Sequence, residues 1–162
     1  MVTLKLYQNE TEKAVNLIQE FWFCHNSYRP SIDEALEDLN NWIKSGNEFY
    51  FIVKDEEPVG FIHLGSRGDK IDWLEDIFVL PLYQNQRIGS KAIALAENIV
   101  SVYSESMYIE TAARNMRALK LYRNLGYDCL NTITVRKDFN GEKHSVISKE
   151  IIANLDFEIR KN

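Results

Sequence analysis

The chain has 162 residues, of which 45% are hydrophobic and 27% are charged. This is the composition of an ordinary globular protein, and we expect one domain over residues 1–162 with a buried core. The formal net charge of −5 argues against a nucleic-acid partner, because proteins that bind nucleic acid usually carry a basic patch. No apolar run has the length of a membrane span and the first residues do not resemble a signal peptide. We therefore expect a cytoplasmic protein without a membrane partner.

The cysteines and histidines are scattered along the sequence. Cys24 and Cys129 match no metal-binding or redox spacing, and no pair among His25, His63 and His144 has the spacing of ligands on one helix. We expect reduced thiols and no metal site.

The N-terminal residues predict a strand followed by a helix. Residues 2–7 alternate between apolar and polar side chains, as in a short strand. Asn9 and Glu12 fit a capping box that opens a helix, and the polar segment 25–30 should end it.

A second helix is predicted from Ser31, which forms a capping-box pattern with Glu34. Gly46 should end this helix. Its apolar face is predicted from residues at helical spacing, namely Ile32, Leu36, Leu39 and Ile43.

The segment 49–80 predicts three strands. Residues 49–54 and 59–65 are rich in aromatic and β-branched residues and flank a turn, which is typical of a hairpin. A third strand over 73–80 should stop before Pro81, because proline cannot donate to a ladder.

The remaining predicted elements are a helix over 88–103, a strand over 106–111, a helix capped by Asn115 and ended by Gly126, a strand over 132–138 with a turn at Asn140-Gly141, and a weakly alternating tail over 151–159. This order predicts an α/β fold with a mixed, mostly antiparallel central sheet flanked by helices.

Residues 79–90 join a strand directly to a helix. Unpaired N–H groups and the positive end of the helix dipole make such a junction a possible anion site. Gly89 lets the backbone approach an anion closely, and Arg87 can add a positive charge. From these residues alone, the segment is either a phosphate site or an ordinary turn with a steric glycine.

Two motifs carry a resemblance to a known family. The stretch Gln84-x-x-Arg87-x-Gly89-Ser90 resembles the pyrophosphate-binding loop of the GCN5-related N-acetyltransferase (GNAT) superfamily, and Phe78-Val79-x-Pro81 fits its usual surroundings. The second signature helix of that family is similar to Asn115-x-x-Ala118-x-x-Leu121-Tyr122-x-x-x-Gly126-Tyr127. Arg87 departs from the pattern, because the family usually has its first glycine there. Each residue alone is explained by capping or packing, but their common register favours the family.

The resemblance implies an enzyme that transfers an acetyl group from acetyl-coenzyme A to a primary amine, by direct attack in a ternary complex. The backbone of Phe78 and Val79 would pair with the pantetheine arm, and the Val79 N–H would polarise the thioester carbonyl. Asn115 would contact the pantetheine or phosphate region, and Tyr122 would protonate the leaving thiolate. The residues implied to hold the pyrophosphate are Gln84, Asn85, Gln86, Arg87, Ile88, Gly89 and Ser90.

An amine with a pKa of about 10.4 is mostly ammonium at neutral pH, so it must lose a proton before it attacks. Glu75 and Asp76 lie in the strand that precedes the loop, and side-chain alternation should place only one of them in the acceptor cleft. The run Leu74-Glu75-Asp76-Ile77-Phe78-Val79 is similar to family members that act on diamines or polyamines. We expect Glu75 to be the base, directly or through a water; a surface carboxylate at a strand edge is the alternative.

The acceptor side in this family is usually lined by the first two helices and their connection. That implies Phe21 and Tyr28 as substrate-binding residues, together with Asp76. Aromatic faces beside acidic groups suit a polyamine-like or other small cationic amine. Alternatively, these aromatic residues belong to the core.

Other functions remain open from the sequence. A non-catalytic sensor that binds acetyl-coenzyme A is favoured by Arg87 and disfavoured by Glu75 and Tyr122. An acetyltransferase acting on protein or peptide amines is a second alternative. A nucleotide-binding module ranks low, because the sequence contains no Gly-x-x-x-x-Gly-Lys-Ser/Thr pattern. A homodimer is possible, and the role of the tail after Gly141 is open.

Overall fold

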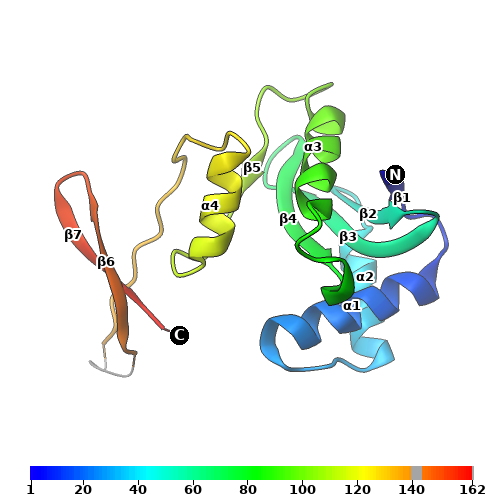
Figure 1. The fold of residues 1–162 in the computed structure, drawn as a ribbon, viewed down its shortest axis with the longest axis horizontal. Helices are drawn as coiled ribbons and strands as arrows, with labels where there is room; N and C mark the ends of the chain where they lie inside the picture. The colour runs from blue at the N-terminus through cyan, green and yellow to red at the C-terminus, as the bar shows by residue number, and fades with distance from the viewer. Residues whose placement is uncertain (140–143, 162) are drawn as a thin grey trace. The chain divides into compact units, whose positions relative to one another are not determined.

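The structure is a computed structural model, and it describes residues 1–139 and 144–161. They fall into two compact units, Met1–Glu110 and Thr111–Asn162, and we describe each by itself (Figure 1). The expectation of a single domain over the whole chain remains a prediction. Among the described residues, no helix has both the length and the apolar character needed to cross a membrane.

The first unit consists of a five-stranded sheet with helices packed on it. The strands run in the order β1-β2-β3-β4-β5, with antiparallel pairs except between β4 and β5, which are parallel. This confirms the predicted mixed, mostly antiparallel α/β fold. The elements are β1 (Val2–Leu6), α1 (Thr11–Asn26), α2 (Ile32–Trp42), β2 (Asn47–Lys54), β3 (Glu57–Ser66), β4 (Ile71–Val79), the 3-10 turn η1 (Pro81–Tyr83), α3 (Ile88–Val100) and β5 (Tyr108–Ile109).

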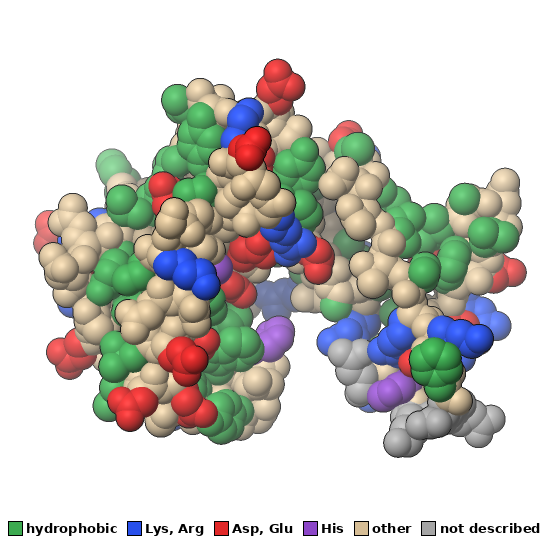
Figure 2. Space-filling model, turned by 180° about the vertical axis from the view of Figure 1, so that it is seen from behind, with side chains coloured by type: hydrophobic (Ala, Val, Ile, Leu, Met, Phe, Trp, Pro, Cys, Tyr) green, Lys and Arg blue, Asp and Glu red, His purple; other side chains and the backbone are tan. Residues whose placement is uncertain are grey.

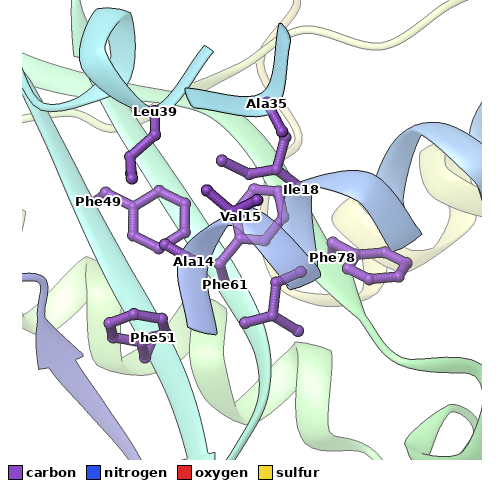
Figure 3. Close-up of a cluster of buried hydrophobic side chains, with 10 residues drawn as sticks. Ala14, Val15, Ile18, Ala35, Leu39, Phe49, Phe51, Phe61 and Phe78 are labelled. Carbon is purple, nitrogen blue, oxygen red and sulfur yellow. The ribbon is translucent and has the colours of Figure 1, made fainter. Parts of the chain in front are cut away.

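Helices bury both faces of this sheet. On one face, phenylalanines of β2, β3 and β4 pack against α1 and α2, as Figure 3 shows. The other face lies against α3, which buries Ile88, Ala92, Ile93, Ala96 and Val100. Because successive strand residues point to opposite faces, burial on both sides explains why the central strands are almost continuously apolar. The members of the phenylalanine cluster are Ala14, Val15, Leu17, Ile18, Ala35, Leu39, Phe49, Phe51, Phe61 and Phe78.

The predicted start of α1 is wrong. The helix begins at Thr11 with Glu10 at its N-cap, and no side chain caps it. The Glu10 carboxylate accepts the backbone N–H groups of Gln8 (3.0 Å) and Asn9 (3.1 Å). In the predicted capping box, the Glu12 side chain would have accepted the Asn9 N–H, so Glu10 takes its place.

The predicted start of α2 is confirmed, but its apolar face is only partly right. The Ser31 hydroxyl accepts the Glu34 N–H (3.2 Å), and the Glu34 carboxylate accepts the Ser31 N–H (2.7 Å). Ile32 and Ile43 are 62% and 38% exposed because they lie at the two ends of the helix, outside its buried face. The residues packed on the core are Ala35, Leu36, Leu39 and Trp42.

The second unit contains α4 (Met116–Asn124) and a two-stranded antiparallel sheet of β6 (Val146–Ile152) and β7 (Leu155–Arg160). The predicted caps of α4 are confirmed: the Asn115 side chain accepts the Ala118 N–H (3.1 Å), and Gly126 beyond the helix end has a φ of 103°.

The predicted strand over 132–138 is wrong, because residues 131–138 have no strand structure. Ile133 and Val135 are 51% and 67% exposed, and a strand is not stable without a partner to complete its ladder. The hairpin of this region is instead the β6–β7 pair, which turns at Ala153 and Asn154 with φ values of 51° and 63°. The predicted turn at Asn140-Gly141 lies outside the described residues.

Candidate active site

The loop between β4 and α3 is held in shape by its own side chains. The Gln84 side-chain amide donates to the Val79 carbonyl (2.9 Å), and the Gln86 side-chain amide donates to the Leu82 carbonyl (3.0 Å). Lys54 of β2 also reaches the loop, with its ammonium 2.9 Å from the Gln86 amide oxygen. The loop backbone is therefore fixed beside a positive charge.

Arg87 adopts the conformation that a glycine favours. Its φ and ψ are 60° and 17°, the left-handed region, and it forms the N-cap of α3. The arginine thus holds a left-handed backbone conformation that is free of strain only for glycine. In the part of the chain that the structure describes, its guanidinium has no hydrogen bond or ion pair. The N–H groups of the first turn of α3 and this free cation together form a suitable site for a phosphate.

The edge of β4 facing away from β3 is largely unpaired among the described residues. β5 pairs with β4 only at Trp73 and Leu74. The Leu80 N–H donates to the Val59 carbonyl in β3 (2.9 Å), so by alternation the N–H of Val79 points to the free edge. An extended ligand can add to such an edge like a further strand.

On its other side, the end of β4 lies unusually close to β3. A side-chain Cβ built on Gly60 would lie 2.1 Å from the Phe78 carbonyl oxygen. Only glycine therefore fits opposite Phe78 and Val79, the two residues predicted to pair with the pantetheine arm.

Glu75 is the extra residue of a β-bulge. His63 pairs with Asp76 but the next residue, Leu64, pairs with Leu74, so Glu75 has no direct partner in β3. Gly65 makes room for it, since a Cβ there would lie 2.8 Å from the Glu75 Cγ. A bulge redirects a side chain, and here the predicted base lies beside Gly65 without a directly paired residue in β3.

The Glu75 carboxylate binds Arg67, which sequence reasoning did not identify. The Arg67 Nε and terminal nitrogen donate to the two oxygens of Glu75 (2.9 and 2.7 Å), and its other terminal nitrogen donates to Glu110 (2.7 Å). The two carboxylates raise the pKa of the Arg67 guanidinium above its usual value, so it is permanently charged. The Glu75 side chain is 24% exposed in this arrangement.

Asp76 contacts a second residue that the sequence analysis missed. Its carboxylate lies 2.9 Å from Nδ1 of His63, and Nε2 of His63 lies 2.9 Å from the Asn47 side-chain oxygen. The imidazole is stacked on Trp42 (centroids 5.0 Å apart) and is 5% exposed. Glu75 and Asp76 thus have entirely separate partners. The available signal for His63 was a single polar residue inside the apolar run of β3.

Phe21 and Tyr28, predicted to bind substrate, are in different environments. Phe21 is half-buried, and its ring centroid lies 5.5 Å from Phe61 and 5.8 Å from Phe78, so it also contributes to the core. The Tyr28 side chain is exposed and its hydroxyl donates to Glu34 (2.8 Å), which raises the pKa of the phenol. Their role in binding remains a prediction.

Asn115 and Tyr122 belong to the second unit, and their roles toward coenzyme A also remain predictions. Burial raises the pKa of the Tyr122 phenol above its usual value of about 10. The phenol is therefore protonated at neutral pH, which is the state required of a proton donor.

The acidic, basic and hydrophobic side chains of the first unit are interspersed on the face shown in Figure 2. No group of three or more His, Cys, Asp or Glu side chains within residues 1–139 and 144–161 could hold a metal ion.

Residues 13–127 match the model of the acetyltransferase (GNAT) family. The chain belongs to this family. The protein is an N-acetyltransferase that uses acetyl-coenzyme A as its acetyl donor, as the sequence predicted. A comparison with curated protein sequences gave no match.

Solved structures with the same fold include several acetyltransferases. AAC(6')-Iy, in complex with the bisubstrate analogue CoA-S-monomethyl-acetylneamine, has 21% sequence identity and a TM-score of 0.65, over 85% of this chain and 99% of that chain. An aminoglycoside acetyltransferase from an uncultured soil metagenomic sample, in complex with sisomicin, has 16% identity and a TM-score of 0.68, over 85% and 95% of the two chains. A putative acetyl transferase from Pyrococcus furiosus has 19% identity and a TM-score of 0.64, over 85% and 100%.

Proposed function

We propose that this GNAT enzyme acetylates a primary amine of a small cationic molecule, of polyamine-like or similar character. The observation that carries the proposal is the position of Glu75 and Asp76 at the bulge in β4, next to the strand's unpaired edge. Carboxylates at this point attract a cation and provide a proton acceptor. Two of the structural neighbours were solved with an aminoglycoside or with an analogue that joins coenzyme A to acetylneamine, and aminoglycosides are cationic amines.

Coenzyme A is proposed to bind along the loop and the β4 edge. The pyrophosphate lies on the N–H groups at the start of α3, with the charges of Arg87 and Lys54 beside it. The pantetheine arm runs along Phe78 and Val79, where the outward N–H of Val79 donates to the thioester carbonyl.

The proposed reaction is a direct transfer. Glu75, alone or through a water, takes a proton from the ammonium group, and the freed nitrogen lone pair attacks the thioester carbon. The carbon–sulfur bond breaks as the carbon–nitrogen bond forms, and the departing thiolate takes the phenolic proton of Tyr122. The Tyr122 pKa, raised by burial, keeps that proton in place until the thiolate forms.

The test combines coenzyme A binding with an amine panel. Polyamines, aminoglycosides, amino acids and peptide N-termini are offered with acetyl-coenzyme A, and released thiol is measured. The variant Glu75→Gln should lower kcat about 100-fold or more without changing the dissociation constant of coenzyme A. Glu37→Gln, on the exposed side of α2, is the matched control. Turnover of peptides alone, or full activity of Glu75→Gln, would contradict the proposal.

A further inference from the structure

β4 and β5 separate at a point marked by two glutamates. Their backbones pair at Trp73 with Tyr108 and at Leu74 with Ile109. The next residue on each strand is a glutamate, Glu75 or Glu110, and the pairing stops there. The backbones of the two glutamates are therefore not paired with one another. Both carboxylates are instead bound to one guanidinium, that of Arg67, at 2.7 to 2.9 Å.

An aromatic surface completes the site around this guanidinium. The Arg67 guanidinium carbon lies 3.9 Å from the Trp73 ring centroid, and the Trp73 ring is stacked on Tyr108 with centroids 5.0 Å apart. The other cations found over rings in the described chain are farther away, at 5.1 to 5.8 Å. A cation held between carboxylates and over an indole face is in the environment that also binds alkylammonium ions. We call Glu75, Glu110 and the Trp73 ring the ammonium site.

Arg67 can leave this position without disturbing the sheet. It lies in the connection between β3, which ends at Ser66, and β4, which begins at Ile71. Its side chain is 39% exposed, and the neighbouring Gly68 has open space around it. Displacement therefore breaks side-chain contacts only. The incoming ammonium replaces one positive charge with another, so the two carboxylates are never left without a cation.

We propose that Arg67 holds the position of the acceptor's ammonium group, and that a cationic amine binds by displacing Arg67 from the ammonium site. This inference rests on the proposed function, because Glu75 is also the proposed base. The exchange places the ammonium directly on the carboxylate that takes its proton. It also makes Arg67 a specificity-determining residue: a polycationic alkylamine competes well with a guanidinium, whereas a zwitterionic amino acid does not.

The test measures spermidine binding by calorimetry to the enzyme saturated with coenzyme A, in which no transfer can occur. Arg67→Met keeps an unbranched side chain at this position and removes the guanidinium, so spermidine should bind about fivefold more tightly or better. The matched control is Arg29→Met, since Arg29 pairs with Glu20 (2.6 Å) and lies 5.1 Å from the Phe23 ring on α1. Methylguanidinium should compete with spermidine in Arg67→Met and much less in the wild type.

Equal or weaker spermidine binding by Arg67→Met overturns the inference. Should that variant lose thermal stability, Glu110→Gln takes its place, because Glu110 is 67% exposed and its replacement leaves the fold intact. It should weaken spermidine binding about fivefold, and unchanged binding overturns the inference. Tighter spermidine binding by Arg67→Met without any acetyl transfer would contradict the proposed function and still support the ammonium site. Normal acetyl transfer by Arg67→Met with unchanged spermidine binding would overturn the ammonium site and leave the proposed function in place.

Discussion

His63 and Asp76 face one another across β3 and β4, with Nδ1 of the imidazole 2.9 Å from a carboxylate oxygen. Only 5% of His63 is exposed, and its other ring nitrogen lies 2.9 Å from the Asn47 side-chain oxygen. A buried imidazole is stable in such a place only while both nitrogens have partners. The pair thereby holds Asp76 in one orientation beside the bulge that carries Glu75.

Replacing Asp76 by alanine should destabilise the protein by about 1–3 kcal/mol, because it leaves a buried polar nitrogen of His63 without its partner. The free energy of unfolding in urea at pH 7 measures this. Asp69→Ala, in the exposed connection before β4, is the control and should change stability by less than about 0.5 kcal/mol. Equal stability of the two variants would show that the His63–Asp76 contact contributes little.

Two substitutions of Arg87 distinguish the effect of backbone strain on stability from the effect of the arginine's charge on coenzyme A binding. Arg87→Gly should stabilise the protein by about 1 kcal/mol, because a residue with a side chain is strained at a φ of 60° and glycine is not. Arg87→Ala keeps the strain and also loses the charge. Both variants should bind coenzyme A about tenfold more weakly at low salt, and the difference from the wild type should shrink at high salt. Denaturation curves and calorimetry test the two effects; a glycine variant that is less stable than the wild type would refute the strain.

Gly60 should tolerate no side chain. In Gly60→Ala the new methyl group would lie 2.1 Å from the Phe78 carbonyl oxygen, which forces β3 and β4 apart. We expect a loss of about 3 kcal/mol or more in stability, and weaker coenzyme A binding because Phe78 and Val79 move. Gly68→Ala is the matched control, since nothing lies within 4 Å of the added carbon. Equal melting temperatures of the two alanine variants would contradict the close approach of β3 and β4 at Gly60.

Tyr122 is predicted to act only in the chemical step. Tyr122→Phe removes the phenolic proton and should lower kcat about 100-fold, while the dissociation constant of coenzyme A stays within about twofold of the wild type. Tyr7→Phe serves as the control, because Tyr7 bonds to Thr11 at the start of α1. A Tyr122→Phe enzyme with normal kcat would assign the phenol to packing, and another group would then protonate the thiolate.

Much of the fold was predictable because its signals are local. The hairpin of β2 and β3, the end of β4 before Pro81 and the capping box of Ser31 each depend on a few adjacent residues. The predictions that were wrong failed because a neighbouring residue competes for the same role, or because the segment has no partner strand. Glu10, and not Glu12, accepts the Asn9 N–H before α1, and residues 132–138 have no partner strand in the described part of the chain.

The sequence by itself determined the family, the acetyl donor and the loop after β4, because those depend on contiguous motifs with a fixed spacing. Only the tertiary structure decided the partners of the two neighbouring carboxylates. A bulge shifts the β3–β4 register at Glu75, and Arg67 contacts a glutamate 43 positions away in the chain. Such contacts depend on how strands align across the sheet, and no spacing along one strand specifies that alignment.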